Sequence, residues 1–228
     1  MSKICIPIRA KSLREFKVAL KKAEPQADLI EVWLDSLKDV SVENVGDIIK
    51  LVKKPLIVTC KAKQEKGDWK QGETKRLNLL LEACKQGADF VDIGVHTNDK
   101  LTKNLIKQKP KSTQLIISWH NFNRTPSLKS LKKTVEKALN LGANIVKIAT
   151  FAKDKGDNYT IFELICWFTE NYKQKNIIAL CMGKKGELSR VHSTGLGAFL
   201  TFAALSKSQI TAPGQLTVTQ MKQKLKQL

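Results

Sequence analysis

Residues 128–150 read LKSLKKTVEKALNLGANIVKIAT and divide into a helix-like half and a strand-like half. The apolar residues of the first half recur at the three- and four-residue spacing of one helix face, namely Leu128, Leu131, Val135, Ala138 and Leu139. Gly142 follows at the position where a left-handed helix C-cap favours glycine. Ile145–Ala149 is then apolar except for Lys147, as in a parallel strand buried on both faces. The segment therefore predicts a helix that leads into a buried parallel strand.

Similar units fill the rest of the chain. Short runs rich in apolar and β-branched residues recur at Ile4–Arg9, Leu29–Leu34, Leu56–Cys60, Phe90–Val95, Gln114–Trp119, Ile145–Thr150, Asn176–Cys181 and, more weakly, Gln209–Thr211. Stretches with helical spacing lie between them, including Leu13–Leu20, Leu77–Cys84 and Leu164–Phe168, and Gly87 repeats the C-cap signal. Repeated strand–helix units predict an α/β protein, a closed (β/α)8 TIM barrel that forms a single domain over residues 1–228.

A doubly wound open sheet is the alternative architecture. It would usually carry a glycine-rich phosphate-binding turn after its first strand, and none follows Arg9. Two features fit a barrel less well. Pro7 lies inside the first run, where it cannot donate a ladder hydrogen bond, and the run at Gln209–Thr211 is short. The barrel is the expected fold, with its eighth strand the least clearly marked.

The composition limits the classes of protein. The formal net charge is +19, which favours an anionic partner such as nucleic acid, a membrane surface or an anionic substrate. The basic residues are scattered, with no run of five or six like charges, so solvated helix faces are the simpler interpretation. No apolar stretch reaches the roughly 18 residues that a membrane span needs, and Met1–Ala10 lacks the apolar core and cleavage site of a signal peptide. We expect no membrane association.

The cysteines and histidines carry no metal-binding pattern. Cys5, Cys60, Cys84, Cys166 and Cys181 are widely spaced, and none forms a Cys-x-x-Cys pair. The sequence also lacks the His-x3-His and His-Glu-x-x-His spacings of zinc sites. We therefore expect no metal and no disulfide framework, and a protein of the reducing cytoplasm.

Polar residues at the carboxyl ends of the strands are the candidates for an active site, because barrel enzymes react there. Lys147 is the most informative of them, since a lysine is almost never fully buried without a reason. One interpretation is a structural lysine paired with Asp92 or Glu31. The other is an amine whose pKa is lowered from about 10.4 towards neutrality by burial and a neighbouring cation. Such an amine can attack a ketone and form an iminium.

Three further side chains fit such chemistry. His120 ends the run before that of Lys147, and its ordinary pKa near 6.5 suits a group that acts first as base and then as acid. Glu65 follows the third run and either orients His120 or is a solvated loop charge. The planar fork of Arg190 suits a carboxylate ligand or a helix cap. His96 and His192 lack this context and are interpreted as ordinary surface residues.

Four ordered segments resemble one known family. They are Ser118–Phe122 followed by Thr125–Ser127, Lys147–Ala149, Met182–Lys184 with Gly186 and Ser189–Arg190, and Ala212–Gln215. Each segment alone is a weak signal, but their joint occurrence in this order has a small probability by chance. On these residues the sequence resembles the type I 3-dehydroquinate dehydratases of the shikimate pathway.

The resemblance implies a barrel lyase that is usually a homodimer and uses no metal and no diffusible cofactor. Its substrate would be the anion 3-dehydroquinate, dehydrated to 3-dehydroshikimate. The resemblance assigns the Schiff base to Lys147, proton transfer to His120, and the pairing with His120 to Glu65. The residues implied in substrate binding are Glu31, Lys61, Asp92, Arg190, Thr211 and Gln215. Among these, Arg190 and Gln215 would hold the substrate carboxylate.

Five positions depart from the family's pattern. The pattern has arginine where this chain has Trp33 and Lys61, serine at Thr211, a carboxylate at Gly94 and glycine at Lys66. The two arginine losses matter most, because lysine does not replace a bidentate arginine. We expect weaker binding with unchanged chemistry, Lys61 as the substitute partner of Glu31, and a lower KM in a Trp33→Arg variant.

Three other functions compete with this one. Another Schiff-base barrel, such as an aldolase, would explain Lys147 but not the segments around Arg190 and Gln215. A barrel impaired by Trp33 and Lys61 would bind ligand without turnover. A nucleic-acid-binding protein would explain the charge, but it needs aromatic residues interleaved with a basic stripe. The sequence offers only hints of such a stripe near Phe122 and Trp69, so we expect no nucleic-acid partner.

Overall fold

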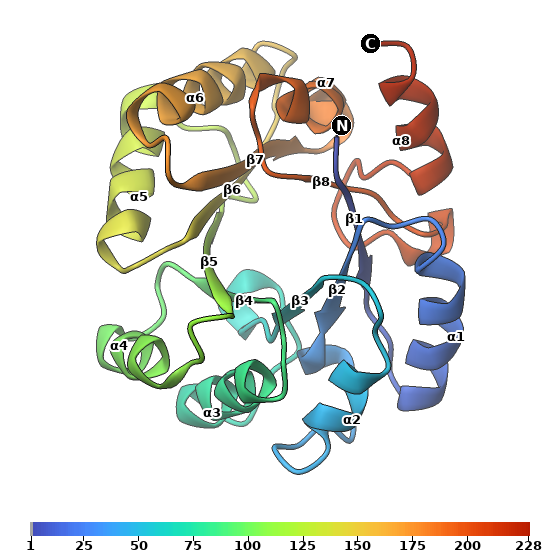
Figure 1. Cartoon of the computed structure of the whole chain (residues 1–228). Helices are drawn as coiled ribbons and strands as arrows, with labels where there is room; N and C mark the ends of the chain where they lie inside the picture. The colour runs from blue at the N-terminus through green and yellow to red at the C-terminus, as the bar shows by residue number, and fades with distance from the viewer. Residues whose placement is uncertain (1) are drawn as a thin grey trace.

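The structure, a computed structural model, describes residues 2–228. Within them, eight parallel strands surround a central axis and helices cover their outer face (Figure 1). The strands are β1 Ile4–Ile8, β2 Leu29–Trp33, β3 Leu56–Thr59, β4 Phe90–Gly94, β5 Gln114–His120, β6 Ile145–Phe151, β7 Asn176–Met182 and β8 Thr201–Phe202. The helices are α1 Leu13–Ala23, α2 Val45–Lys50, α3 Glu73–Lys85, α4 Asp99–Gln108, α5 Leu128–Asn140, α6 Asp157–Asn171, α7 Glu187–His192 and α8 Val218–Leu225. This is the predicted single-domain (β/α)8 barrel.

The strands pair in the order β7-β6-β5-β4-β3-β2-β1-β8. Strand β8 lies beside β1, and the seam to β7 is bridged just before β8 by a hydrogen bond of 2.7 Å from Phe199 N to Ile177 O. The sheet is therefore a nearly closed barrel rather than an open doubly wound sheet.

The eighth strand was predicted in the wrong place. Gln209–Thr211 is not a strand, since Lys207–Gln209 forms a 3-10 turn and Ile210 is 46% exposed. The strand is Thr201–Phe202 instead, with both residues buried. Only two residues of this strand pair with β1. The barrel therefore requires neither a long apolar run nor β-branched side chains here, and the sequence signal for this strand is weak.

Pro7 is accommodated because β8 is so short. Lys3 O and Cys5 O accept hydrogen bonds from Thr201 N and Ala203 N of the β8 segment, so the odd-numbered residues of this strand turn their backbone groups towards β8. Pro7 lies further along the same side, beyond the residues that pair with β8. The hydrogen bond that proline cannot donate is therefore not needed there.

Two apolar layers hold the barrel together. One lies between the strands and the helices, and the other fills the inside of the barrel with residues such as Leu29, Ile116 and Ile178. Gly87 and Gly142 end their helices with φ of 104° and 96°, which confirms the two predicted C-caps. Within residues 2–228, no helix is long and apolar enough to cross a membrane.

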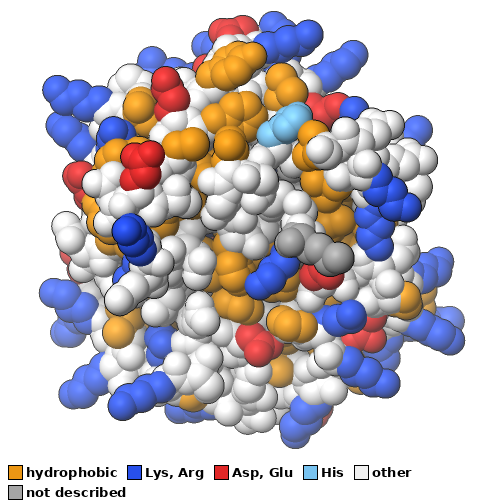
Figure 2. Space-filling view, turned by 45° about the horizontal axis from the view of Figure 1, so that its top comes forward, with side chains coloured by type: hydrophobic (Ala, Val, Ile, Leu, Met, Phe, Trp, Pro, Cys, Tyr) orange, Lys and Arg blue, Asp and Glu red, His pale blue; other side chains and the backbone are white. Residues whose placement is uncertain are grey.

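The lysines and arginines are spread over the surface. In Figure 2 they lie among acidic, apolar and neutral side chains and form no continuous band on the visible face. This distribution fits solvated helix faces better than a nucleic-acid-binding stripe.

Candidate active site

The side chains inside the barrel change from apolar to polar towards the carboxyl ends of the strands. Because alternate residues of a strand face the same side, each change occurs in a two-residue step. The steps run from Leu29 to Glu31, Phe90 to Asp92, Ile116 to Ser118 and His120, and Ile145 to Lys147. The register pairs Ser118 with Lys147 and His120 with Ala149, which brings these groups to one end of the barrel.

Lys147 lies between two carboxylates and is 7% exposed. Its Nζ donates to Glu31 Oε1 at 3.0 Å and to Asp92 Oδ2 at 2.9 Å, and it lies 4.4 Å from the centroid of the Phe202 ring. Burial alone would lower the pKa of Lys147, but Asp92 and Glu31 together raise it above its ordinary value. The resting lysine is therefore an ammonium ion paired with Asp92 and Glu31, as the first interpretation of the sequence had it. The second interpretation, an amine whose pKa is lowered, is wrong for the free protein. The sequence pattern alone does not show that the two carboxylates affect the pKa of Lys147 more strongly than its burial does.

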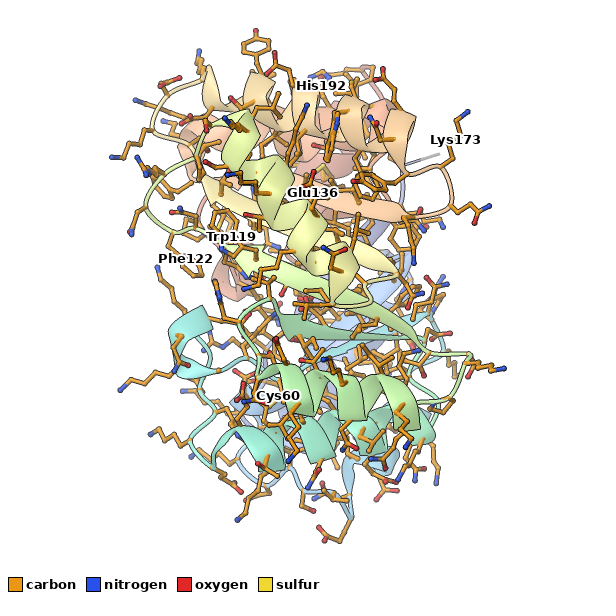
Figure 3. The ribbon with its side chains drawn as sticks, turned by 90° about the vertical axis from the view of Figure 1, so that its left-hand side faces the viewer. Cys60, Trp119, Phe122, Glu136, Lys173 and His192 are labelled. Atoms are coloured by element: carbon orange, nitrogen blue, oxygen red, sulfur yellow. The ribbon has the colours of Figure 1, made fainter. Side chains whose placement is uncertain are left out.

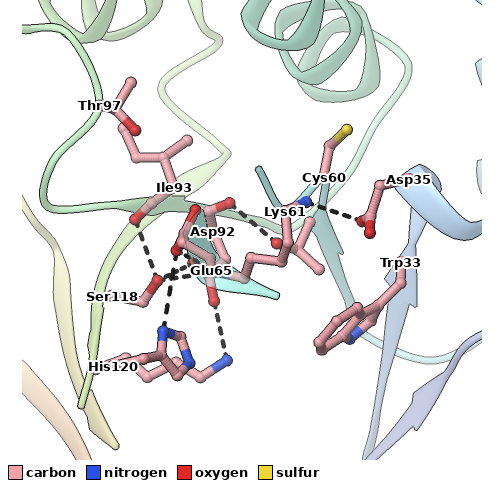
Figure 4. Close-up of polar contacts among 12 residues, drawn as sticks. Trp33, Asp35, Cys60, Lys61, Glu65, Asp92, Ile93, Thr97, Ser118 and His120 are labelled. Atoms are coloured by element: carbon pink, nitrogen blue, oxygen red, sulfur yellow. Dashed lines mark hydrogen bonds and ion pairs between the residues drawn. The ribbon is translucent and has the colours of Figure 1, made fainter. Parts of the chain in front are cut away.

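Asp92 is completely buried behind this lysine. Its Oδ1 accepts hydrogen bonds from Lys61 Nζ at 2.7 Å and Ser118 Oγ at 2.6 Å (Figure 4). Its Oδ2 accepts from Lys147 Nζ. Burial opposes ionisation, yet Lys147 and Lys61 hold the pKa of Asp92 well below its usual range. Both oxygens are occupied, so Asp92 sets the charge around the lysine and does not reach the cavity wall.

His120 and Glu65 approach each other from β5 and from the loop after β3. The distance from His120 Nδ1 to Glu65 Oε1 is 3.9 Å (Figure 4), which is longer than a hydrogen bond. Burial, and then the charges of Lys61 and Lys147, lower the pKa of His120 well below its ordinary value. The imidazole is therefore neutral at neutral pH and can accept a proton.

The absence of a side chain at Gly94 makes room for this Glu65 carboxylate. A Cβ at Gly94 would lie 2.7 Å from Glu65 Oε1 and 2.9 Å from its Oε2. This chain lacks the carboxylate that the family's pattern has at position 94. The carboxylate of Glu65 lies next to Gly94 instead.

An aromatic ring covers His120. Phe122 stacks on the imidazole with 5.7 Å between centroids and 7° between planes. Lys66 Nζ lies 4.0 Å from the centroid of the Phe122 ring. Figure 3 shows Phe122 and Trp119 at the edge of the molecule opposite Lys173.

The β2 side of the site contains a chain of contacts that begins at Glu31. Trp33 Nε1 donates to Glu31 Oε2 at 2.7 Å. The guanidinium of Arg9 lies 5.2 Å from the centroid of the Trp33 ring and donates to Asp68 Oδ2 at 2.7 Å. Trp33 therefore faces the site. Its indole N–H replaces one of the hydrogen-bond donors that an arginine at this position would supply, and its ring contacts the guanidinium of Arg9.

The opposite side offers unused donors. Arg190 is 1% exposed and donates from Nη2 to Pro213 O at 3.1 Å, while its buried Nε has no partner within the described residues. Burial lowers the pKa of Arg190 to about 10, so it stays charged at neutral pH. Gln215 Oε1 accepts from the backbone N and the hydroxyl of Thr211 at 2.9 and 3.1 Å, which leaves its N–H groups for a ligand.

These groups surround a cavity of about 180 Å³. Eight of the nine predicted site residues line it, namely Glu31, Lys61, Glu65, His120, Lys147, Arg190, Thr211 and Gln215. Arg9 and Lys66 add two cations to its wall. Five cationic side chains then face three carboxylates, counting Asp92 behind the wall. The arrangement favours a small anionic ligand.

Two details differ from the sequence-based expectations. Lys61 Nζ contacts Asp92, Ser118 and Glu65, whereas Glu31 is held by Trp33 and Lys147, so the expectation that Lys61 would become the partner of Glu31 is wrong. Arg9 was missed altogether. Its position at the end of the first strand run was the signal that could have identified it.

No group of three or more His, Cys, Asp or Glu side chains arranged to hold a metal ion occurs among residues 2–228. His96 is exposed, and His192 packs edge-on against Phe162 with 6.3 Å between ring centroids.

The chain is similar to known proteins over nearly its whole length. The family model described as type I 3-dehydroquinase matches residues 4–228. The 3-dehydroquinate dehydratase of Methanocaldococcus jannaschii is 39% identical over 226 residues, which cover 96% of each chain. The bifunctional 3-dehydroquinate dehydratase/shikimate dehydrogenase of Arabidopsis thaliana is 36% identical over 219 residues, which are 95% of this chain and 36% of that protein.

A solved structure resembles the barrel over nearly its whole length. The crystal structure of type I 3-dehydroquinate dehydratase from Clostridium difficile with covalently modified comenic acid has a TM-score of 0.91 and 25% identity. The match covers 99% of this chain and 92% of that one.

Proposed function

Because the chain belongs to the type I 3-dehydroquinase family, we propose that it dehydrates 3-dehydroquinate to 3-dehydroshikimate through a Schiff base on Lys147. Dehydratase activity in the shikimate pathway follows from membership of the family. The observation that carries the mechanism is Lys147 itself, a buried lysine held between Glu31 and Asp92 beside a neutral histidine, in a small cavity with a net excess of cations. The alternative of an aldolase that uses Lys147 is not needed to explain this arrangement.

Lys147 has to lose a proton before it attacks the substrate ketone. Glu31 lines the cavity and supplies one of the two carboxylate contacts that favour the ammonium form. Substrate hydroxyl groups that hydrogen-bond to Glu31 would weaken this contact and favour the neutral amine. The neutral imidazole of His120 takes the proton of the ammonium, and the amine adds to the ketone. The imidazolium then returns the proton to the carbinolamine hydroxyl, which leaves as water and produces an iminium. This iminium is again a cation between Glu31 and Asp92, so the carboxylates that hold the resting ammonium also stabilise the intermediate.

His120 performs the proton transfers. As a neutral base it removes a proton from the carbon next to the iminium, and the electron pair is delocalised into the C=N group. The protonated imidazole then delivers that proton to the departing hydroxyl, which leaves as water. Hydrolysis of the product iminium restores Lys147 and releases the ketone. Glu65, 3.9 Å from Nδ1, stabilises the imidazolium that exists between the two transfers.

The two sides of the cavity orient the substrate. Arg190 has an unpartnered Nε and Gln215 has free N–H groups, and together they bind the carboxylate. Glu31 and the neighbouring cations bind the hydroxyl groups on the opposite side. Thr211 acts indirectly, because its hydroxyl and backbone N–H fix the amide of Gln215.

The decisive test is borohydride trapping with 3-dehydroquinate, followed by peptide mass mapping. Reduction of the iminium should attach the substrate or product skeleton to the peptide that contains Lys147 and to no other peptide. A stable adduct on a different lysine would contradict the assignment, and turnover without any adduct would contradict the Schiff base itself.

The sequence led us to expect a lower KM in a Trp33→Arg variant, but the contacts of Trp33 lead to the opposite expectation. We expect Trp33→Arg to raise KM about five- to thirtyfold, with kcat changed by less than about twofold, since the loss of one hydrogen bond and one cation–π contact costs about 1–2 kcal/mol. The new guanidinium would compete with Lys147 for Glu31, repel Arg9 and remove the ring on which Arg9 lies. Steady-state kinetics test this.

Trp33→Phe is the matched control for that variant. It keeps an aromatic ring beside Arg9, and it removes the pyrrole part of the indole with the N–H that reaches Glu31. We expect a smaller rise in KM than in Trp33→Arg. A lower KM in Trp33→Arg would show instead that the site still functions best with arginine.

We further propose that the protein is a homodimer, as the resemblance implies, and that it is cytoplasmic, as its cysteines indicate. The burial of Cys5, Cys60, Cys84 and Cys181 as free thiols in the core suits a reducing compartment. Light scattering of the purified chain would measure its oligomeric state.

A further inference from the structure

Lys66 has an unusual backbone conformation. With a φ of 61° and a ψ of 26°, it is the only non-glycine residue with positive φ among residues 2–228. It terminates the 3-10 turn Lys63–Glu65. The left-handed region is unfavourable for a residue with a Cβ atom and costs glycine almost nothing. A lysine without a role at this position would therefore be worse than glycine.

The loop around Lys66 is fixed at both ends. Asp35 accepts hydrogen bonds from Lys61 N at 2.8 Å and from Asp68 N at 2.9 Å. A Cβ at Gly67 would overlap the carbonyl oxygen of Lys61, so the chain turns very tightly here. These contacts hold Lys66 in its conformation and fix the direction of its side chain.

That side chain reaches the rim of the cavity. Lys66 lines the same cavity as Lys147, and its Nζ lies over the Phe122 ring at 4.0 Å. The same ring stacks on His120. Lys66 thus places a positive charge over the aromatic residue that covers the proton-transfer group.

We propose that Lys66 is a substrate-binding residue of the rim, which attracts the anionic substrate and helps to keep Phe122 stacked on His120. The proposal rests on the proposed function. The strained backbone is the consequence of presenting a side chain from a loop position that would otherwise suit glycine. Replacing Lys66 by glycine should therefore improve stability, whereas any substitution that removes the ammonium should impair substrate capture.

The experiment compares Lys66→Gly with Lys66→Ala. Both variants lose the ammonium, so we expect both to raise KM for 3-dehydroquinate about three- to tenfold and to change kcat by less than about twofold, as for a rim charge that acts on capture. The KM difference should shrink in about 1 M salt, where the Debye length falls to about 3 Å. Only Lys66→Gly removes the Cβ, so only this variant should melt about 2–4 °C higher than the natural chain.

Two controls isolate the local effect. Lys66→Arg keeps a cation that binds to an aromatic face and should keep KM close to that of the natural chain. Lys173→Ala removes the same net charge at the opposite edge of the molecule (Figure 3) and should leave KM unchanged.

Several results would overturn the proposal. An unchanged KM in both Lys66→Gly and Lys66→Ala would show that the ammonium of Lys66 does not take part in substrate binding. An equal rise in KM in Lys173→Ala would show that only the net charge of the protein matters. Equal melting temperatures for the glycine and alanine variants would remove the argument from strain. An inactive natural chain would refute the proposed function and this proposal together, whereas an active one with those results would refute only this proposal.

Discussion

Lys147→Ala is expected to reduce turnover of 3-dehydroquinate on the order of 10⁴- to 10⁶-fold, the scale on which enzymes lose activity with their covalent nucleophile. Alanine cannot form the iminium, and the barrel contains no second amine between Glu31 and Asp92 in the described residues. Borohydride should then trap no adduct. Steady-state assays at high protein concentration measure the residual rate.

The same substitution also affects stability. Removing the ammonium leaves two buried carboxylates with fewer partners, and breaking a buried ion pair typically costs about 3–5 kcal/mol. Lys61 still neutralises Asp92, and Trp33 still binds Glu31, so we expect a folded protein with a lower melting temperature. Thermal denaturation followed by circular dichroism measures this loss.

Lys147→Arg is the matched variant that separates charge from chemistry. Its guanidinium can still bind the two carboxylates, but it stays protonated and cannot act as the nucleophile. We expect it to recover much of the stability and none of the activity. Turnover in Lys147→Arg near that of the natural chain would exclude Lys147 as the Schiff-base residue.

His120→Ala is expected to lower kcat about 10²- to 10⁴-fold, the usual contribution of a positioned acid–base group. Schiff-base formation should persist, only more slowly, because Lys147 and both of its carboxylates are untouched. Borohydride should therefore trap mainly the undehydrated substrate on Lys147, one water heavier than the product adduct. Since His120 Nδ1 has no hydrogen-bond partner within the described residues, we expect only a small loss of stability.

The pH dependence of the natural enzyme provides a second test of His120. Its pKa is lowered, so the neutral base persists at neutral pH and is lost only as the pH falls through that lowered value. The acid limb of kcat/KM that belongs to this base should thus lie below the usual histidine value of about 6.5. It should disappear in His120→Ala.

His192→Ala is the control for both tests, since this histidine packs against Phe162 away from the cavity. It should leave kcat and the pH profile unchanged. Near-normal turnover in His120→Ala would instead show that Glu65 or a water molecule moves the proton.

The sequence alone determined the barrel and the location of its reactive end. Apolar runs with strand-like composition, separated by amphipathic helices and glycine C-caps, are local patterns that follow directly from backbone geometry. The same patterns placed Lys147 and His120 at neighbouring strand positions. The position of the short β8 was not predicted, because two paired residues leave almost no signal in the local sequence.

Only the tertiary structure decided the electrostatics of the site. The pKa of Lys147 depends on Glu31, which is 116 residues away in the chain, and on Asp92, 55 residues away. The stacking of Arg9 on Trp33, the room that Gly94 leaves for Glu65, and the left-handed backbone of Lys66 likewise depend on distant segments. The preference of a segment for helix or strand arises from its own residues and their near neighbours, which a sequence displays. Charge pairing and cavity shape arise from distances between strands, which exist only once the barrel has closed.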